Sequence, residues 1–290
     1  MRIGLVSGTP SATTTALASV CVPGLSIQAL TPAGALDVLV PGDAAVGRLD
    51  VRQTLDGVEE GLWALGVLAA RGVTVLNPPG TLLATHDKLL TARVLARAGL
   101  PHPCTRHVRC AGAVPPVAAP VVLKPRHGSW GRHVTLCETT GDLVAALDGV
   151  RDELWFREHG ALVQDLIPPT GSDLRLVVAG GRVVGAVRRV AAPGEWRTNV
   201  ALGAARRPLA PSPRAIRLAI AAAEASGAAL VGVDLLETPD GGLTVLELNG
   251  AVDFTDVYRP GGDVFRETML ELAAACTSAS RPEHDDALLV

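Results

Sequence analysis

Three oxygen-bearing side chains that could ligate a metal lie in two apolar, strand-like segments near the C-terminus. Asp234 falls within residues 231–236, and Glu247 and Asn249 fall within residues 243–249, with an Asp-Gly-Gly turn between the segments. Side chains alternate along a strand, so Glu247 and Asn249 share a face to which a paired strand can bring Asp234. Buried carboxylates are costly unless they are paired or bind metal. Oxygen ligands suit Mg²⁺, which shares its coordination with phosphates, and the hairpin therefore predicts a nucleotide–magnesium site.

Two lysines and a glycine-bearing loop stand where phosphates could bind. Lys124 closes an apolar segment, a costly place for a cation unless an anion compensates it. The loop that follows could bring backbone N–H groups to an anion through Gly128, Ser129, Trp130 and Gly131. Lys88 begins an expected helix, where the helix dipole disfavours a cation and favours a bound anion. No Walker sequence is present, so a plain hairpin turn and a solvated lysine remain alternative interpretations.

Arginines accumulate between residues 175 and 217. This stretch holds nine arginines, no lysine and one acid, Glu195. Arginine binds carboxylates and phosphates with two parallel hydrogen bonds, so the cluster indicates anionic substrates, and we assign a substrate role to Arg189 and Arg197. A high-GC coding bias or a solvated face would also explain the cluster. We interpret the last four members as surface residues: Arg206, Arg207, Arg214 and Arg217.

A strand expected over residues 162–167 ends at two prolines. This passage from strand to linker, at Asp165, Leu166 and Ile167, could present backbone groups to an adenine ring, or it could simply connect two domains. Asp173 lies two residues before Arg175 and could bind a ribose hydroxyl or pair with that arginine. The residues alone leave both choices open.

Composition excludes several classes of protein. A net charge of −3 and an aromatic content of 3% argue against a nucleic-acid-binding module. No apolar run approaches the ~20 residues of a membrane span, and five cysteines without a CxxC pair favour a reduced, cytoplasmic location. The histidines lack zinc spacing, and no GxSxG elbow or Cys/His pair indicates a covalent nucleophile.

The elements that must position these residues predict an α/β protein with α+β subdomains. Residues 1–84 form an expected small α/β domain, with strands at 1–6, 36–40 and 73–76 and a helix over 58–71. Residues 85–160 form a central subdomain, with a helix over 87–98, strands at 121–124 and 134–138 around the glycine loop, and a helix over 143–150. Residues 161–277 hold strands at 162–167, 174–178 and 182–190, a helix over 214–226 and the hairpin, and a flexible tail follows over 278–290.

Taken in order, these pieces resemble an ATP-grasp ligase from about residue 73 to residue 272. Within that superfamily the chain is similar to the RimK-like group, and within it to the LysX-type ligases that act on an amino-group carrier protein. The resemblance rests on four stretches: Pro-Val-Val-Leu-Lys-Pro at 120–125, Gly-Ser-Trp-Gly-Arg at 128–132, Trp-Arg-Thr-Asn at 196–199 and Glu-Leu-Asn at 247–249.

The resemblance implies the following roles. Lys88 and Lys124 contact ATP phosphates beneath the loop, residues 165–167 frame the adenine, and Asp173 lies near the ribose. The hairpin trio binds Mg²⁺, while Arg189 and Asn199 face the transferred phosphoryl group and the carboxylate. The reaction would form an amide through an acyl phosphate, joining an amino acid to the C-terminal glutamate of a small acidic carrier protein. A homo-oligomer is also expected.

Several residues depart from the pattern that the family implies. The hinge holds Asp165 and Leu166 where glutamate and an aromatic residue are usual, and Leu202 stands where the family carries arginine. The residues after Asn249 differ as well. Two other functions therefore stay open, namely a RimK-like ligase for free small molecules (glutamylation or dipeptide formation) and a non-catalytic nucleotide-binding relative.

Overall fold

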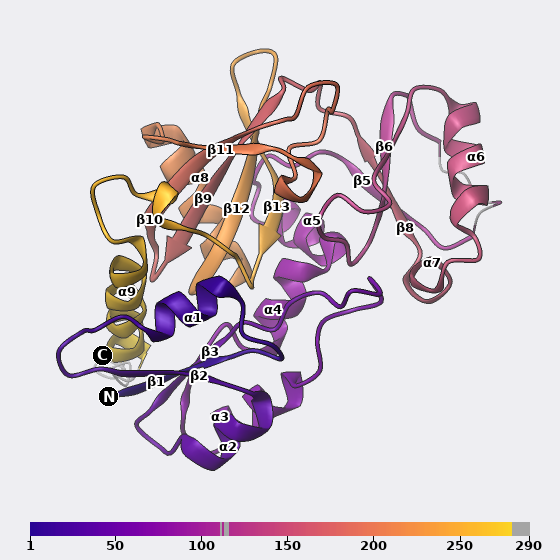
Figure 1. The fold of residues 1–290 in the computed structure, drawn as a ribbon. Coiled ribbons are helices and arrows are strands. Elements are labelled where there is room, and N and C mark those ends of the chain that lie inside the picture. Colours follow the sequence, from indigo (N-terminus) through magenta and orange to yellow (C-terminus); the bar gives the residue numbers. More distant parts are fainter. Residues whose placement is uncertain (111, 113–115, 280–290) are drawn as a thin grey trace, which may run out of the picture.

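Three sheets organise the computed structural model, which describes residues 1–110, 112 and 116–279 (Figure 1). The first is parallel, in the order β2-β1-β3-β4, and consists of β1 (Arg2–Val6), β2 (Ser26–Leu30), β3 (Ala44–Gly47) and β4 (Thr74–Leu76). Its helices are α1 (Ala12–Ala18), α2 (Pro32–Val38), α3 (Leu62–Ala70) and α4 (Pro79–His86). The parallel pairing confirms the α/β character that was predicted for this part of the chain.

One strand of this region was predicted wrongly, because residues 36–40 include the end of helix α2. Thr31 caps that helix by accepting a hydrogen bond from the Gly34 N–H, and Pro32 occupies the first turn, where a missing N–H costs nothing. This capping signal outweighs the short apolar run, and the buried strand is β3 instead. The helix predicted over 58–71 begins only at Leu62, because Val58 forms a β-bridge.

The second sheet is antiparallel, in the order β5-β8-β6-β7. It contains β5 (Thr105–Val108), β6 (Val121–Pro125), β7 (Thr135–Cys137) and β8 (Ala161–Asp165), with α5 (Lys88–Arg97) before it and α6 (Thr140–Val150) and α7 (Leu154–His159) between β7 and β8. In Figure 1, α6 and α7 lie on the far right, away from the rest of the molecule. As predicted, β6 and β7 pair on either side of the glycine loop.

The third sheet is antiparallel, in the order β11-β10-β9-β12-β13. Its strands are β9 (Ser172–Ala179), β10 (Arg182–Val190), β11 (Ala205–Pro208), β12 (Leu230–Glu237) and β13 (Leu243–Asn249). Helices α8 (Pro213–Ser226) and α9 (Val264–Ala279) and the short 3₁₀ segments η1 (Val200–Leu202) and η2 (Asp256–Tyr258) complete it. The predicted hairpin is confirmed, whereas α1, α4, α7, α9, β2, β5 and β11 were not predicted. Ser278 belongs to α9, and residues 280–290 of the predicted tail lie outside the described residues.

The two faces of the third sheet differ in chemistry because side chains alternate along its strands. Leu176, Val231, Val233 and Leu235 point to one face, where they form a buried core with the small alanines of α8. The residues between them carry most of the charges discussed below. Burial on the α8 side therefore fixes the register of every strand and, with it, the positions of the charged side chains on the other face.

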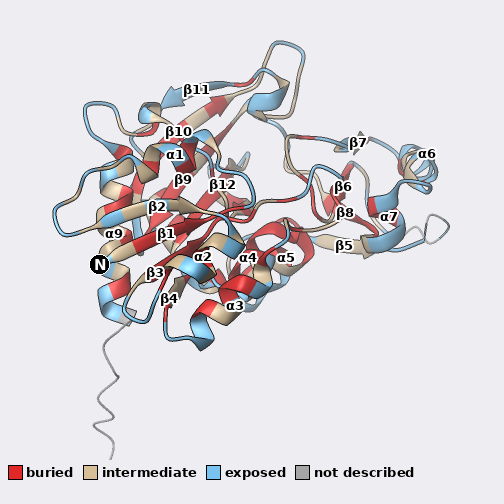
Figure 2. Ribbon diagram, turned by 60° about the horizontal axis from the view of Figure 1, so that its bottom comes forward, coloured by how far each residue is buried: buried red, intermediate tan, exposed pale blue. Residues whose placement is uncertain are grey.

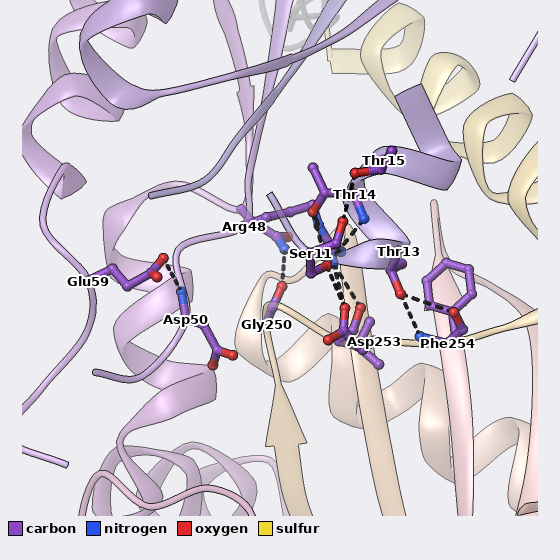
Figure 3. A network of polar contacts seen from close by, with 12 residues as sticks. Ser11, Thr13, Thr14, Thr15, Arg48, Asp50, Glu59, Gly250, Asp253 and Phe254 are labelled. Atoms are coloured by element: carbon purple, nitrogen blue, oxygen red, sulfur yellow. Dashed lines mark hydrogen bonds and ion pairs between the residues drawn. The ribbon is translucent and has the colours of Figure 1, made fainter. Parts of the chain in front are cut away.

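The first sheet is joined to the third by a network of polar contacts (Figure 3). The Thr13 hydroxyl donates to the Phe254 carbonyl and accepts from the Phe254 N–H, both at 3.0 Å, and Ser11 Oγ donates to Asp253 Oδ1 at 2.7 Å. Buried Arg48 donates to the Val252 carbonyl at 3.0 Å. Because residues 252–254 directly follow the hairpin, the N-terminal part of the chain borders the site. Figure 2 shows that strands of the first and third sheets are largely buried.

Among the residues that the structure describes, no helix combines the length and the apolar character needed to cross a membrane.

Candidate active site

A cavity of about 280 Å³ lies where the second and third sheets face each other. Its lining includes Lys88 and Lys124, the loop from Gly128 to Gly131, and the charged face of the third sheet. Asp50 and His86 contribute from the N-terminal part of the chain. Every one of the predicted site residues lines this cavity, although they come from segments more than 150 residues apart.

Strand register explains why the charged side chains of the third sheet meet. Asp234 on β12 lies directly opposite Glu247 on β13 and opposite Arg175 on β9. One row further along, Arg189 on β10 lies opposite Asp173 on β9. Alternation with period two places all five on the same face, away from α8. The predicted meeting of Asp234 with Glu247 is confirmed.

A buried network of salt bridges occupies the centre of this face. Asp234 accepts hydrogen bonds from Arg175 Nε and Nη2, both at 2.6 Å, and from Arg189 Nη2 at 2.8 Å. Asp173 accepts two from Arg189, one of them at 2.7 Å, and one from the Thr198 hydroxyl at 2.6 Å. The predicted alternative that Asp173 pairs with Arg175 is wrong, because strand pairing brings Arg175 to Asp234 instead.

Electrostatics keeps this network charged. Burial alone would raise the pKa of Asp234, but the guanidinium groups of Arg175 and Arg189 outweigh it and lower that pKa to about 2. The side chains of Asp234 and Arg189 are each 4% exposed, and such charges are tolerated in a protein interior only when their partners are in place. Asp173 is fully buried and its oxygens are occupied, so its geometry suits holding Arg189 better than contacting a ribose.

The predicted metal ligands retain capacity to accept a cation. Asp234 receives three hydrogen bonds, which leaves about one acceptor position on Oδ1. Glu247 forms an ion pair with Lys88, whose Nζ lies 3.4 Å from Oε1, and the buried Nδ2 of Asn249 has no partner among the described residues. The described residues contain no group of three or more His, Cys, Asp and Glu side chains suited to a metal. Two carboxylates and an amide fit Mg²⁺, which would take its other ligands from phosphates and water.

The two predicted phosphate lysines approach the cavity from different elements. Lys88 begins α5, whose cap is Asp87, and its Nζ donates to the Gly128 carbonyl. Asp87 is in turn held by a two-pronged salt bridge from Arg126. Lys124, on β6, is 5% exposed and donates to the neutral Gln164 Oε1 at 2.7 Å. Burial lowers the pKa of Lys124 to about 8, with Glu247 raising it and Lys88 lowering it further.

The glycine loop is closed over the cavity by contacts from the third sheet. Trp130 and Gly131 both adopt positive φ, 60° and 72°, which turns the chain back toward β7. Arg197, paired with Glu195, donates to the Gly131 carbonyl at 3.0 Å. A side chain at position 131 would lie 2.8 Å from Asn199 Oδ1, so glycine allows this close approach. Arg197 therefore holds the loop, while Asn199 lies beside it in the cavity lining.

The hinge between the sheets lies at the end of β8. Asp165, Leu166 and Ile167 line the cavity in succession, and Asp165 is bound by Arg106 Nη1 at 2.7 Å. The Asp165 side chain is 46% exposed, so this salt bridge contributes little to stability. The apolar residues at 166 and 167 remain candidates for contacting a flat ring.

Several cavity residues escaped the sequence analysis. Gln164, the partner of Lys124, interrupts an apolar strand, and that interruption could have revealed it. Arg206 was interpreted as a surface residue but lines the cavity, because β11 was not predicted. Asp50 and His86 carry no motif; burial raises the pKa of Asp50 to about 6 and lowers that of His86 to about 3.

Comparisons with known proteins agree with this geometry. Residues 85–271 match the model of the RimK-like ATP-grasp domain. A protein of Shewanella amazonensis named "Probable alpha-L-glutamate ligase 2" is 31% identical over 219 residues, which cover 73% of this chain and 71% of that protein.

Solved structures share the fold. An ATP-grasp RimK domain protein from Sphaerobacter thermophilus superposes with a TM-score of 0.67 at 24% identity, covering 96% of this chain and all of the other. The ATP-grasp ligase PsnB, solved with a minimal precursor, Mg and ADP, superposes with a TM-score of 0.64 at 18% identity, covering 94% and 98%. The predicted RimK-like resemblance is confirmed.

Proposed function

Because this chain belongs to the RimK-like ATP-grasp family and is a ligase of the kind that forms C–N bonds, we propose that it uses MgATP to activate a carboxylate and joins it to the amino group of an amino acid. The acid is proposed to be the C-terminal glutamate of a small acidic carrier protein. The product would be an amide, together with ADP and phosphate.

One observation carries the proposal. Lys124 lies buried in the cavity and, among the described residues, its ammonium group donates a hydrogen bond only to a neutral amide. A buried cation without a bonded carboxylate is unfavourable until an anion arrives. Lys88 and the N–H groups of the glycine loop border the same space, which supports a polyphosphate as that anion.

Magnesium would be held by Glu247, Asn249 and the remaining acceptor position of Asp234. The metal supplies charge neutralisation for the phosphates when it is bound. Glu247 also forms an ion pair with Lys88, so the same carboxylate would orient a lysine and hold a metal. Solved structures of this fold include one that contains Mg and ADP, which supports the pairing of metal with nucleotide.

The side chains of the cavity suit positioning rather than covalent catalysis. In the first step a carboxylate oxygen attacks the terminal phosphorus of ATP, and ADP leaves. In the second step the amine nitrogen attacks the acyl carbon, phosphate leaves, and the nitrogen loses a proton. Arg189, held by Asp173 and Asp234, and Asn199 are proposed to face the developing charge, because fixed donors stabilise it without reorganisation.

The nature of both organic substrates is supported by relatives and by charge. The relative from Shewanella is named a glutamate ligase, and PsnB was solved with a precursor, which supports an amino acid as amine and a polypeptide as acid. The edge strand β11 carries Arg206 in the cavity lining, which would favour an acidic partner.

The test is ADP release with Mg²⁺, ATP and a panel of amino acids, with and without an acidic carrier peptide that ends in glutamate. We expect carrier-dependent release and a gain of one amino-acid residue in the mass of the carrier. Glu247→Ala should abolish both, whereas Glu224→Ala, an exposed position on α8 outside the cavity, should not. Release with free amino acids alone would indicate a small-molecule ligase. MgATP binding without turnover in any mixture would contradict the proposal and indicate a non-catalytic relative.

A further inference from the structure

Two arginines stand side by side at the edge of the third sheet. Arg206 on β11 lies directly opposite Arg189 on β10, on the face that lines the cavity. Directly opposite residues of an antiparallel pair have Cβ atoms about 4.5–5.5 Å apart, and like charges at that distance are destabilising. A pair of this kind calls for a compensating anion.

The two arginines differ in their partners. Arg189 is neutralised by Asp173 and Asp234. Arg206 has no salt bridge and no side-chain hydrogen bond to any described residue, and its Nε is buried without a partner. The next residue, Arg207, points to the other face, is exposed and lies outside the cavity lining. The uncompensated charge therefore belongs to Arg206 and faces the cavity.

A buried hydroxyl lies near the two arginines but outside the cavity lining. The Tyr258 hydroxyl has no partner among the described residues, although the residue is only 2% exposed. Tyr258 belongs to η2, which packs against β10 and β11. Burial raises its pKa, while the positive charges of Arg175, Arg206 and Arg189 lower it, as expected for a hydroxyl near these arginines. The guanidinium group of Arg206, which does line the cavity, suits a carboxylate.

This anion is distinct from the phosphates of the nucleotide. The groups that would hold phosphates and metal lie on α5, β6, β12 and β13. The backbone of Arg206 lies at the opposite edge of the third sheet, three strands and about 14 Å from the backbone of Asp234 at the usual strand spacing, and Arg189 lies between them. A carboxylate at Arg206 would thus belong to the organic substrate, at a distance from the carboxylate that is phosphorylated.

Building on the proposed function, we infer that Arg206 binds a second, non-reacting carboxylate of the acid substrate. The enzyme would then select acids with two carboxylates, such as a chain that ends in glutamate. Arg206 is in this sense a specificity residue, and Arg189 remains the residue near the reacting group.

The experiment compares peptides that end in glutamate with matched peptides in which one terminal carboxylate is replaced by an amide. The wild-type enzyme should use the amide forms at least 10-fold less efficiently. Arg206→Gln should raise KM for the glutamate peptide about 10- to 100-fold, the range for loss of a charged hydrogen bond, and leave KM for ATP unchanged. In Arg206→Gln the discrimination against the amide forms should disappear. Arg207→Gln, the matched control, should change neither constant.

Other outcomes separate the two proposals. No turnover by the wild type with any acid would contradict the proposed function, and the inference would then be tested by calorimetric binding of N-acetylglutamate to wild type and Arg206→Gln. Equal binding of N-acetylglutamate by wild type and Arg206→Gln would overturn the inference. Turnover with equal use of mono- and dicarboxylic acids, a rise in KM for ATP in Arg206→Gln, or equal effects of the two substitutions would also overturn it. Arg206→Lys should recover only part of the selectivity, since a lysine cannot form two parallel bonds.

Discussion

The third sheet and the second sheet treat buried charge in opposite ways. On the third sheet, Arg175 and Arg189 reach Asp234 and Asp173 at 2.6–2.8 Å, so each charge has a partner of opposite sign. On the second sheet, Lys124 is equally buried but hydrogen-bonds to neutral Gln164. The two sheets face each other across one cavity.

This difference separates charges that position other groups of the protein from charges that bind a ligand. A charge that is paired within the protein holds its neighbours in place and has fewer donors or acceptors left for a ligand. A buried charge without a bonded counterion is unfavourable in the free protein, and a ligand of opposite sign relieves that penalty. The paired network is therefore expected to govern folding and geometry, whereas Lys124 is expected to govern nucleotide affinity.

The largest effect should follow from breaking the paired network. Asp234→Asn leaves two buried guanidinium groups with one carboxylate between them, and removing one partner of a buried pair costs about 3–5 kcal/mol of unfolding free energy. Urea denaturation measures the loss. Glu237→Gln is the control, because the Arg188–Glu237 pair is about a third exposed and should contribute less than about 1 kcal/mol. Equal losses in the two variants would contradict the distinction between positioning and binding charges.

The next effect should appear in nucleotide affinity alone. Lys124→Met removes the buried cation and keeps most of its apolar volume, so the unfolding free energy should stay the same or rise. The value of kcat/KM for ATP should fall about 100-fold, the usual effect of losing one fixed charge-stabilising donor. Steady-state kinetics and urea denaturation measured on one preparation test this. A variant that loses stability but keeps its ATP kinetics would show that Lys124 is structural.

The sequence alone predicted the residues that carry the chemistry of the cavity better than it predicted the contacts that hold those residues in place. The hairpin of Asp234 and Glu247 was predictable because a turn and two alternating strands are local patterns. The pairing of Arg175 with Asp234 was not, because it depends on β9 lying between β10 and β12, which local patterns do not encode. Fold class and most strands of the second and third sheets followed from periodicity, whereas sheet order and the strands β2, β3, β5 and β11 did not.

The missed residues have the same physical explanation. Arg206 entered the cavity lining because the short strand β11 pairs with β10, and four exposed or half-exposed residues give no apolar alternation to predict such a strand. The strand predicted at 36–40 failed for the opposite reason. There an apolar run was present, but the cap at Thr31 and the proline after it made the segment helical.

Alkaline pH should affect activity and stability in opposite directions. Burial, opposed by Glu247 and aided by Lys88, lowers the pKa of Lys124 to about 8, whereas an unfolded lysine titrates near 10.4. Above pH 8 the folded protein loses the proton first, so kcat/KM for ATP should fall by up to about tenfold per pH unit. The unfolding free energy should rise over the same range, because the unfolded state binds more protons. Lys124→Arg should remove the decline in kcat/KM below pH 10. An unchanged pH profile would show that another group causes the decline.

The smallest effect should be seen at His102, which lies beside Gln164 and close to Lys124. Burial lowers the pKa of His102 to about 4, a hydrogen bond to the Val245 carbonyl opposes the shift, and the positive charge of Lys124 adds to it. Lys124→Met should therefore raise this pKa by less than about one unit, or 1.4 kcal/mol, as measured by NMR titration. His86, whose charged neighbours include Lys88, Arg48 and Asp50 but not Lys124, should not change. Because the unfolded histidine titrates near 6.5, stability is lost as the pH falls from about 6.5 toward 4, and this loss should be smaller in Lys124→Met. If His102 titrates identically in both proteins, Lys124 is already neutralised in the free enzyme, and the contrast between the two sheets does not hold.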